Sequence, residues 1–272
     1  MKIFRYIGLF SLICFTFFYT DKIIDVSIMH DKVMMDIQDD KDNYYVKPID
    51  AIIDNDFIIP GNVGREVNVD KSYNEMKRLG YYDSSLLIFD NIYPDKSIFN
   101  NYDKYIVKGN VYNKNVSLIF IVKNKNLINN ITLIANKKNV IVNYFIDEVF
   151  LNNNIDIIST INNNEIYNYG NDGIYSKDNI IIGNNIINNK SNNKANFCLF
   201  LNTDSNSLNN CANNKMLSIM PSFVGNFNSI KNKLENGSII LINNTYDLES
   251  IIDYINSKGY KIVSLSELVN EK

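Results

Sequence analysis

Histidine is nearly absent from this sequence. His30 is the one histidine among 272 residues, and tryptophan does not occur. Imidazoles serve as general bases in many hydrolases and as ligands in most catalytic zinc sites. A single imidazole excludes a metal centre that needs two or three of them, and it leaves most hydroxyl nucleophiles without a base. Because His30 lies in a charged segment near the N-terminus, we expect it to be a solvated side chain.

Positive charge is also scarce. Lysine and arginine number 27 against 30 acidic residues, so the net charge is −3. A protein that binds nucleic acid normally presents a basic stripe that displaces counterions from phosphates. No such stripe occurs in this sequence, and we therefore exclude nucleic acid as a partner.

Several short catalytic motifs are missing as well. The sequence holds no G-x-S-x-G, no H-E-x-x-H and no phosphate-binding glycine loop. These motifs place a nucleophile on a sharp turn, a zinc ion on a helix and a phosphate at a helix N-terminus, respectively. Hydrolases and nucleotide-dependent enzymes of those types are therefore excluded.

Cysteine is rare, with three in the chain. Cys14 lies inside an apolar N-terminal run, whereas Cys198 and Cys211 flank a polar, asparagine-rich stretch. In an oxidising compartment two thiols at this spacing form a disulfide, which stabilises a fold by about 3 kcal/mol on the chain-entropy model. We expect Cys198 and Cys211 to pair, and two buried free thiols are the alternative.

The N-terminus has the pattern of an export signal. Lys2 and Arg5 precede the apolar run 6–20, which charged residues then close. No small residues mark a cleavage site, and the run is shorter than the roughly 20 residues that span a bilayer. We expect residues 1–22 to be an uncleaved membrane anchor that holds the protein outside the cytoplasm. The alternative is a cleaved signal peptide and a secreted protein.

Residues 23–104 carry little regular periodicity. The acidic stretch 36–42 suits a solvated stalk, whereas Val69 to Leu79 suit a short helix that Gly80 ends. We expect a stalk followed by a small α+β extension.

A regular alternation of strands and helices begins at residue 105 and continues to the C-terminus. Segments of helical period separate the strands, and the clearest places Leu248, Ile251, Ile252 and Ile255 on one face. Continuous apolar strands are typical of parallel sheets, and about seven β-α steps favour a barrel over an open sheet. We therefore expect residues 105–272 to form an α/β domain, a distorted (β/α) barrel of about seven parallel strands. The expected strands are 116–122, 140–146, 165–169, 197–201, 216–220, 238–242 and 261–265.

Four segments of this domain carry a recognisable order of residues. The first strand ends VSLIFIVKN, the third continues as EIYNYGNDG, a late strand reads GSIILIN and the chain closes with KGYKIVSLSEL. Together they resemble the polysaccharide deacetylase family, carbohydrate esterases that remove acetyl groups from chitin, peptidoglycan or xylan. The resemblance covers residues 105–270 and implies a (β/α) barrel with its site at the carboxyl ends of the strands.

The same resemblance implies a chemistry that this sequence does not support. Family members hold a divalent metal with two histidines four residues apart and an aspartate, while a second aspartate acts as base and a further histidine as acid. Here Ile121 and Val122 stand at the aspartate positions, Tyr169 and Gly173 at the histidine pair, and Asn243 at the late histidine. We therefore predict no catalytic residues, no bound metal and no cofactor.

These features predict a catalytically inactive, deacetylase-like protein of the cell envelope that binds cell-wall glycan. Tyrosine rings stack on sugars and side-chain amides bond their hydroxyls, so we assign binding to the loops that follow the strands. One alternative is a structural or regulatory protein that uses residues 54–108 to bind an unknown partner. Another is an active deacetylase with divergent ligands. The residues assigned to glycan binding are Tyr169, Asp172, Asn243, Asn244 and Tyr246.

Overall fold

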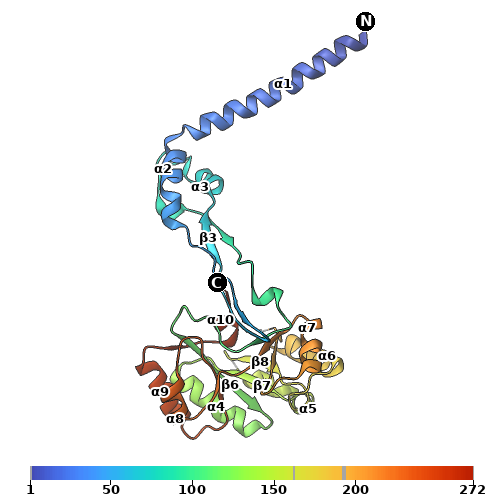
Figure 1. Ribbon diagram of the computed structural model, residues 1–272, viewed down its shortest axis with the longest axis vertical. Coiled ribbons are helices and arrows are strands. Elements are labelled where there is room, and N and C mark those ends of the chain that lie inside the picture. The colour runs from blue at the N-terminus through green and yellow to red at the C-terminus, as the bar shows by residue number, and fades with distance from the viewer. Residues whose placement is uncertain (1, 162, 192–193, 272) are drawn as a thin grey trace. The chain divides into compact units, whose positions relative to one another are not determined.

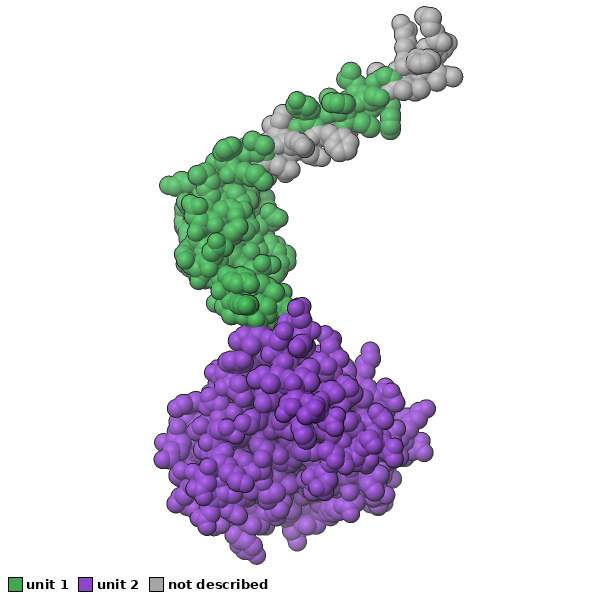
Figure 2. Space-filling view, in the orientation of Figure 1, with its two compact units in different colours: residues 1–48, 63–93 green, residues 49–62, 94–272 purple. Residues whose placement is uncertain are grey.

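The computed structural model describes residues 2–161, 163–191 and 194–271, and the side chains of residues 2–7, 9, 17–18 and 21–25 lie outside this description. The chain forms two compact units (Figure 2). The smaller unit contains residues 1–48 and 63–93, and the larger unit contains residues 49–62 and 94–272. The range 54–108, which we considered as one working surface, is therefore divided between the two units.

The smaller unit contains a helical core where we expected a stalk. Asp31 accepts a hydrogen bond from the backbone N–H of Val33 and so caps helix α2. The acidic stretch 36–42, which we assigned to a stalk, forms the end of α2 and the start of the 3-10 helix η1. Val33 and Ile37 are buried, so one face of α2 packs on the rest of the unit, including Met76. The elements are α1 (Lys2–Met29), α2 (Lys32–Asp40), η1 (Lys41–Tyr44), β3 (Gly64–Val67), α3 (Val69–Met76), η2 (Ser84–Leu86) and β4 (Phe89–Ile92).

Helix α1 contains the segment that we expected to be a membrane anchor. Within the part of the chain that the structure describes, no helix combines the length and the apolar character needed to cross a membrane. His30 follows α1 and is exposed.

The larger unit is built from two sheets whose strand pairs are parallel except for one hairpin (Figure 1). The six-stranded sheet has the order β11-β12-β6-β7-β8, with β13 also paired to β6, and the five-stranded sheet has the order β1-β2-β5-β10-β9. Each of the seven segments expected to be a strand contains one. The strands are β1 (Ile52–Asp54), β2 (Phe57–Ile59), β5 (Tyr105–Ile106), β6 (Asn115–Val122), β7 (Asn143–Ile146), β8 (Glu165–Asn168), β9 (Phe197–Leu199), β10 (Leu217–Ile219), β11 (Phe223–Gly225), β12 (Ile239–Ile242) and β13 (Lys261–Ile262).

The strands bury side chains on both faces, as their continuous apolar runs require. On β6, Phe120 and Val122 pack against the helices, whereas Ile119 belongs to an inner cluster. Both sheets contribute to this inner cluster, which is the interior of the barrel. Its members from the strands are Ile58, Ile106, Ile119, Phe145, Tyr167, Phe197, Leu199, Leu217, Ile219, Ile239 and Leu241.

The helices of the larger unit follow the sequence pattern closely in α9 and less closely in α5. The four apolar residues predicted on one face of α9 are all buried, and Gly259 follows the helix with a φ of +77°. The apolar segment 147–161 forms two short helices that are divided at Asn154, because the Asn154 φ and ψ of −139° and 46° are not helical. The helices are α4 (Lys125–Lys138), α5 (Glu148–Asn153), η4 (Ile155–Thr160), α6 (Lys177–Lys190), α7 (Ser205–Asn213), α8 (Phe227–Lys233), α9 (Leu248–Ser257) and α10 (Leu265–Leu268), and η3 (Ile98–Asn100) precedes them.

The hairpin of β1 and β2 belongs to the larger unit although its residues precede 105. Ile58 is fully buried in the inner cluster, and β2 pairs in parallel with β5. The buried Glu271 carboxylate accepts hydrogen bonds from the backbone N–H groups of Gly61 and Ile98, both at 3.1 Å. Long-range contacts of this kind leave no local pattern in the sequence.

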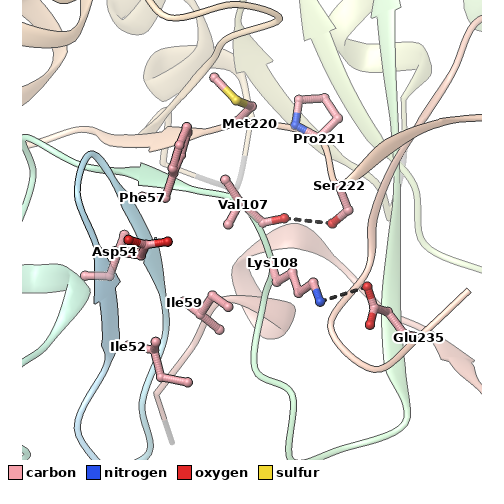
Figure 3. A pocket seen from close by; sticks show the side chains of 11 residues that line it. Ile52, Asp54, Phe57, Ile59, Val107, Lys108, Met220, Pro221, Ser222 and Glu235 are labelled. Atoms are coloured by element: carbon pink, nitrogen blue, oxygen red, sulfur yellow. Dashed lines mark hydrogen bonds and ion pairs between the residues drawn. The ribbon is translucent and has the colours of Figure 1, made fainter. Parts of the chain in front are cut away.

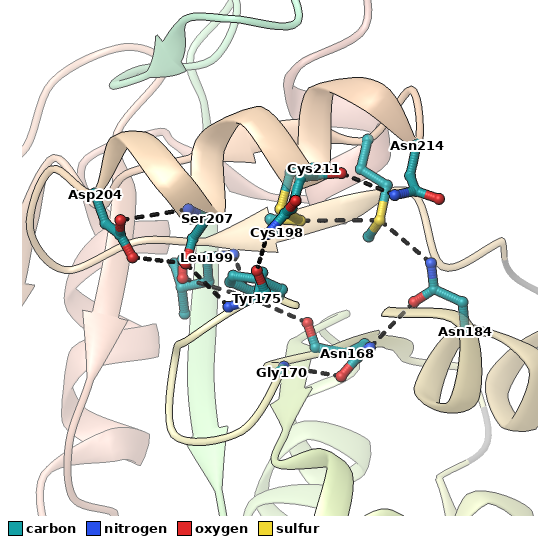
Figure 4. The surroundings of a disulfide bond; sticks show 12 residues. Asn168, Gly170, Tyr175, Asn184, Cys198, Leu199, Asp204, Ser207, Cys211 and Asn214 are labelled. Carbon is teal, nitrogen blue, oxygen red and sulfur yellow. Dashed lines mark hydrogen bonds between the residues drawn. A yellow bond between two sulfur atoms is a disulfide. The ribbon is translucent and has the colours of Figure 1, made fainter. Parts of the chain in front are cut away.

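Tyr175 joins the two sheets where β8 and β9 are not paired (Figure 4). Its buried hydroxyl accepts a hydrogen bond from the Leu199 N–H at 2.7 Å and donates to the Asn168 carbonyl at 3.1 Å. Beside this contact, Cys198 of β9 and Cys211 of α7 form a disulfide with a Cα–Cα distance of 6.5 Å. The hydroxyl thus links β9 to the end of β8, and the disulfide links β9 to α7.

Candidate functional site

Three parallel strands end at the same level and define the edge at which a site is expected. The register pairs Val122 with Ile146 and Ile146 with Asn168. The next residue along each strand therefore lies at one edge, and the loops that follow converge there.

The end of β6 supplies apolar side chains to this edge. Ile121 is partly buried against the inner cluster, whereas Val122 is fully buried against the helices. A branched aliphatic side chain has no donor atom for a metal ion. Val122 packs in the cluster between the strands and the helices and so serves the core of the fold.

The turn after β8 brings Tyr169 and Gly173 into contact. The Gly173 N–H donates to the Tyr169 carbonyl at 3.0 Å, and Gly173 has a φ of +82°. A Cβ atom added to Gly173 would lie 2.9 Å from the Tyr169 Oη and 3.1 Å from its Cζ. The phenol ring therefore fills the space in which a side chain at residue 173 would lie.

Asp172 in the same turn is tied to its neighbours. Its backbone N–H donates to the Asp147 Oδ2 at 2.9 Å, and its carboxylate forms an ion pair with the Lys123 ammonium. Asp147 also caps α5 by accepting from the Phe150 N–H at 3.2 Å. The side chains of Lys123 and Asp172 are 48% and 73% exposed, so their ion pair contributes at most about 1 kcal/mol to stability.

Two groups at this edge have raised pKa values. Burial raises the pKa of the Tyr169 phenol, and the Asp172 and Asp147 carboxylates raise it further. Burial also raises the pKa of Glu148, with Asp147 as the second cause. Tyr169 is therefore a neutral phenol near pH 7.

A pocket of about 320 Å³ opens between the turn after β8 and the loop after β9. Asp204 at its end caps α7 by accepting from the Asn206 N–H at 3.0 Å and from the Ser207 hydroxyl at 2.6 Å. The Ser207 hydrogen bond is the largest cause that lowers the pKa of Asp204, so this carboxylate is ionised and already engaged. The lining residues are Tyr169, Asp172, Gly173, Leu199, Phe200, Leu201, Asn202, Thr203 and Asp204.

Comparison with solved structures identifies this architecture. BA3943, a CE4 family pseudoenzyme from Bacillus anthracis, superposes with a TM-score of 0.65 and 23% identity over 89% of this chain and 96% of that chain. A mutant of BA3943 with restored enzymatic activity gives a TM-score of 0.66 and 22% identity over 89% and 99%. The chain has the polysaccharide deacetylase fold.

The likeness extends to a peptidoglycan N-acetylglucosamine deacetylase, Bc1960. This structure superposes with a TM-score of 0.53 and 18% identity over 60% of this chain and 92% of that chain. No family profile matches the sequence, and no curated protein matches it. The resemblance inferred from the motifs is thereby confirmed for the fold.

The polysaccharide deacetylase fold brings together two of the five residues that we assigned to glycan binding. Tyr169 and Asp172 line the pocket, but Asn243, Asn244 and Tyr246 are not among its lining residues. These three follow β12 and are exposed, Tyr246 to 95%. The Asn244 side-chain oxygen accepts from the Tyr246 N–H at 3.3 Å, which gives this loop its own local turn.

The loop after β9 is one of the strand-end loops in which we expected a site, but none of its residues was among the five assigned to glycan binding. Asn202 and Thr203 line the pocket and are exposed, so their polar groups can reach a ligand. The signal was present, because this loop follows a predicted strand of a barrel and carries two short polar side chains. The abundance of asparagine elsewhere in the chain concealed it.

The residues at the strand ends do not fit the metal that the polysaccharide deacetylase fold usually holds. Within residues 2–161, 163–191 and 194–271, no group of three or more histidines, cysteines or acidic residues is arranged to hold a metal ion. Asp147 and Asp172 lie close together but are used by the α5 cap and by Lys123, respectively. In this turn a neutral phenol, Tyr169, and a glycine without a side chain, Gly173, stand where family members have the two imidazoles.

Proposed function

We propose that this protein is a catalytically inactive polysaccharide deacetylase-like protein. One observation carries the proposal: the Tyr169 ring occupies the space above Gly173, where the second of two metal ligands would stand. Ile121 and Val122 supply no carboxylate at the end of β6. Without a cation to polarise an acetyl carbonyl and activate water, hydrolysis by this route has neither an activated electrophile nor an activated nucleophile.

The test is an acetate-release assay on the purified full-length protein. We expect no acetate from N-acetylated or O-acetylated glycans above a buffer blank, and less than about 0.1 equivalent of zinc, nickel or cobalt by elemental analysis. Release of acetate that a chelator abolishes would refute the proposal and favour an active enzyme with divergent ligands. Bc1960 assayed in parallel shows that the substrate is competent.

We further propose that the pocket between β8 and β9 binds cell-wall glycan, with peptidoglycan as the leading candidate. The pocket volume is near the lower end of the range for small-ligand sites, which suits one sugar ring. Asn202, Thr203 and Asp172 offer amide, hydroxyl and carboxylate groups to sugar hydroxyls. The 5% exposure of Tyr169 leaves its ring too covered for stacking, so recognition depends on hydrogen bonds.

Co-sedimentation with purified peptidoglycan tests this binding. Asn202→Ala removes a hydrogen-bonding amide from the pocket and is expected to reduce the affinity about two- to tenfold. Asn244→Ala is the matched control, because Asn244 is exposed but lies outside the pocket lining. Equal retention of both variants, or retention no better than that of an unrelated acidic protein, would contradict the proposal.

A location outside the cytoplasm, in the cell envelope, is the third part of the proposal. Cys198 and Cys211 are both fully buried in a disulfide, and such bonds persist in oxidising compartments. The basic and apolar N-terminal segment supports the same location. Protease treatment of intact cells tests this location, with a cytoplasmic protein as the protected control. We expect the protease to digest this protein, and a protein that stays intact would contradict the proposed location.

A further inference from the structure

A second pocket lies in the larger unit, away from the strand-end site. It has a volume of about 390 Å³ and shares no lining residue with the pocket between β8 and β9 (Figure 3). The hairpin of β1 and β2 forms one wall, and the residues that follow β5 and β10 form the other. Nothing in the proposed glycan-binding function uses this pocket.

The walls of this hairpin pocket are largely apolar. Ile58 is fully buried beneath it, whereas Ile52 is 55% exposed at its rim. The Ser222 hydroxyl donates to the Val107 carbonyl at 2.7 Å and accepts from the Ile239 N–H at 3.0 Å, so it has no free donor for a ligand. The apolar lining residues are Ile52, Phe57, Ile58, Ile59, Val107, Met220 and Pro221.

Three ionised side chains line the same pocket, and their charges do not cancel. The Lys108 ammonium lies 2.7 Å from a Glu235 carboxylate oxygen, so this pair is neutral overall. Asp54 forms no ion pair among those found in the described residues, and its carboxylate accepts from the neutral Asn55 amide at 3.1 Å. One negative charge therefore remains beside an apolar surface.

We propose that this pocket binds a small organic cation that combines an apolar ring or chain with one protonated amine. The apolar body would lie against the hairpin and Met220, and the amine would pair with Asp54. The volume is close to the lower limit for ligand pockets, which suits a single ring with a short chain. A neutral ligand would lose the charge pairing, and an anionic ligand would be repelled.

The probe is 2-phenylethylamine, with 2-phenylethanol as the uncharged analogue and 3-phenylpropionate as the anionic one. An alkyl amine is protonated at neutral pH, as the lysine side chain is. Titration of the isotope-labelled full-length protein is followed by NMR. We expect the amine to bind about two- to fivefold more tightly than the alcohol, and this advantage to fall as salt is raised from about 20 mM to 500 mM.

Two pairs of variants distinguish binding in the pocket from a general effect of the protein's net charge on the amine. Asp54→Asn removes the carboxylate of the pocket, and Asp56→Asn makes the same change two residues along, outside the lining. Ile52→Lys places a cation at the pocket rim, and Ile53→Lys places one on the neighbouring residue of β1, which does not line the pocket. We expect Asp54→Asn and Ile52→Lys to weaken amine binding at least twofold, and their controls to leave it unchanged.

Three outcomes would overturn the proposal. One is an amine that binds no more tightly than the alcohol, and another is an Asp56→Asn effect as large as that of Asp54→Asn. The third is the absence of saturable NMR chemical-shift changes at Ile52, Phe57 or Met220 up to about 10 mM amine. A dissociation constant above about 10 mM would not support a specific site. Because Ile52 and Asp54 are exposed, their variants are expected to fold, and the NMR spectra report folding directly.

Discussion

The phenol oxygen of Tyr169 lies 2.9 Å from the point at which a side chain on Gly173 would begin. These two residues stand four positions apart in the turn that follows β8, where the polysaccharide deacetylases place two imidazoles. The ring and the bare backbone fit each other, so the turn is packed as a structural element. A metal site would require both residues to change together, and any side chain at residue 173 would be strained at its φ of +82°.

Gly173→Ala is expected to destabilise the fold by about 2–3 kcal/mol. About 1–2 kcal/mol comes from the positive φ, and the remainder from the contact with the Tyr169 ring. In a Tyr169→Ala background the same substitution should cost only the part due to the backbone. Denaturant unfolding of the four proteins of this double-mutant cycle measures both parts. An unchanged cost of Gly173→Ala in the Tyr169→Ala background would show that the ring does not fill this space.

Removing the disulfide is expected to cost about 3 kcal/mol of unfolding free energy, because the cross-link restricts the unfolded chain between Cys198 and Cys211, 13 residues apart. The double variant Cys198→Ala with Cys211→Ala shows the loss by denaturant unfolding, and reductant should then have no further effect. Cys14→Ala is the control, since Cys14 lies outside the disulfide and should leave stability unchanged. Wild-type stability that does not respond to reductant under unfolding conditions would contradict the prediction.

Tyr175→Phe should loosen the seam between β8 and β9. Loss of the hydroxyl leaves the buried Leu199 N–H without its acceptor, which costs about 1–3 kcal/mol. Hydrogen exchange at the Leu199 amide should accelerate by more than at other amides of β9. Tyr246→Phe removes a hydroxyl from a side chain that is 95% exposed. It is expected to change neither the free energy of unfolding nor the exchange rate of the Leu199 amide. Equal exchange at Leu199 in both variants would argue against a bridging role for Tyr175.

Glu148 is expected to make stability depend on pH. Its pKa is raised in the folded protein by burial and by Asp147, so the folded state binds the proton more tightly than the unfolded state. The stabilisation is present below the unfolded pKa and is lost as the pH rises through the folded pKa. Glu148→Gln should therefore raise the Tm at pH 7 and leave it nearly unchanged at about pH 3.5. The exposed Asp156→Asn serves as control, and a lower Tm for Glu148→Gln at pH 7 would contradict the assignment.

The sequence by itself determined seven of the strands in the larger unit, the buried face of α9 and the lack of an imidazole pair. Continuous apolar runs marked the strands because a parallel strand is buried on both faces, and the period of α9 marked its buried side. A single histidine cannot supply the pair of imidazoles that the metal site of the family uses. These properties are local or compositional, so they can be derived from the chain alone.

The tertiary structure decided which residues meet. It directed Val122 toward the helices, placed the Tyr169 ring over Gly173, added the hairpin 49–62 to the larger unit and left Asn243, Asn244 and Tyr246 outside the pocket. It also brought the Cα atoms of Cys198 and Cys211 within 6.5 Å of each other in a disulfide. The sequence alone had left both a disulfide and two free thiols open. The physical reason is that such contacts join segments distant in the chain, and their geometry depends on how whole strands and helices pack.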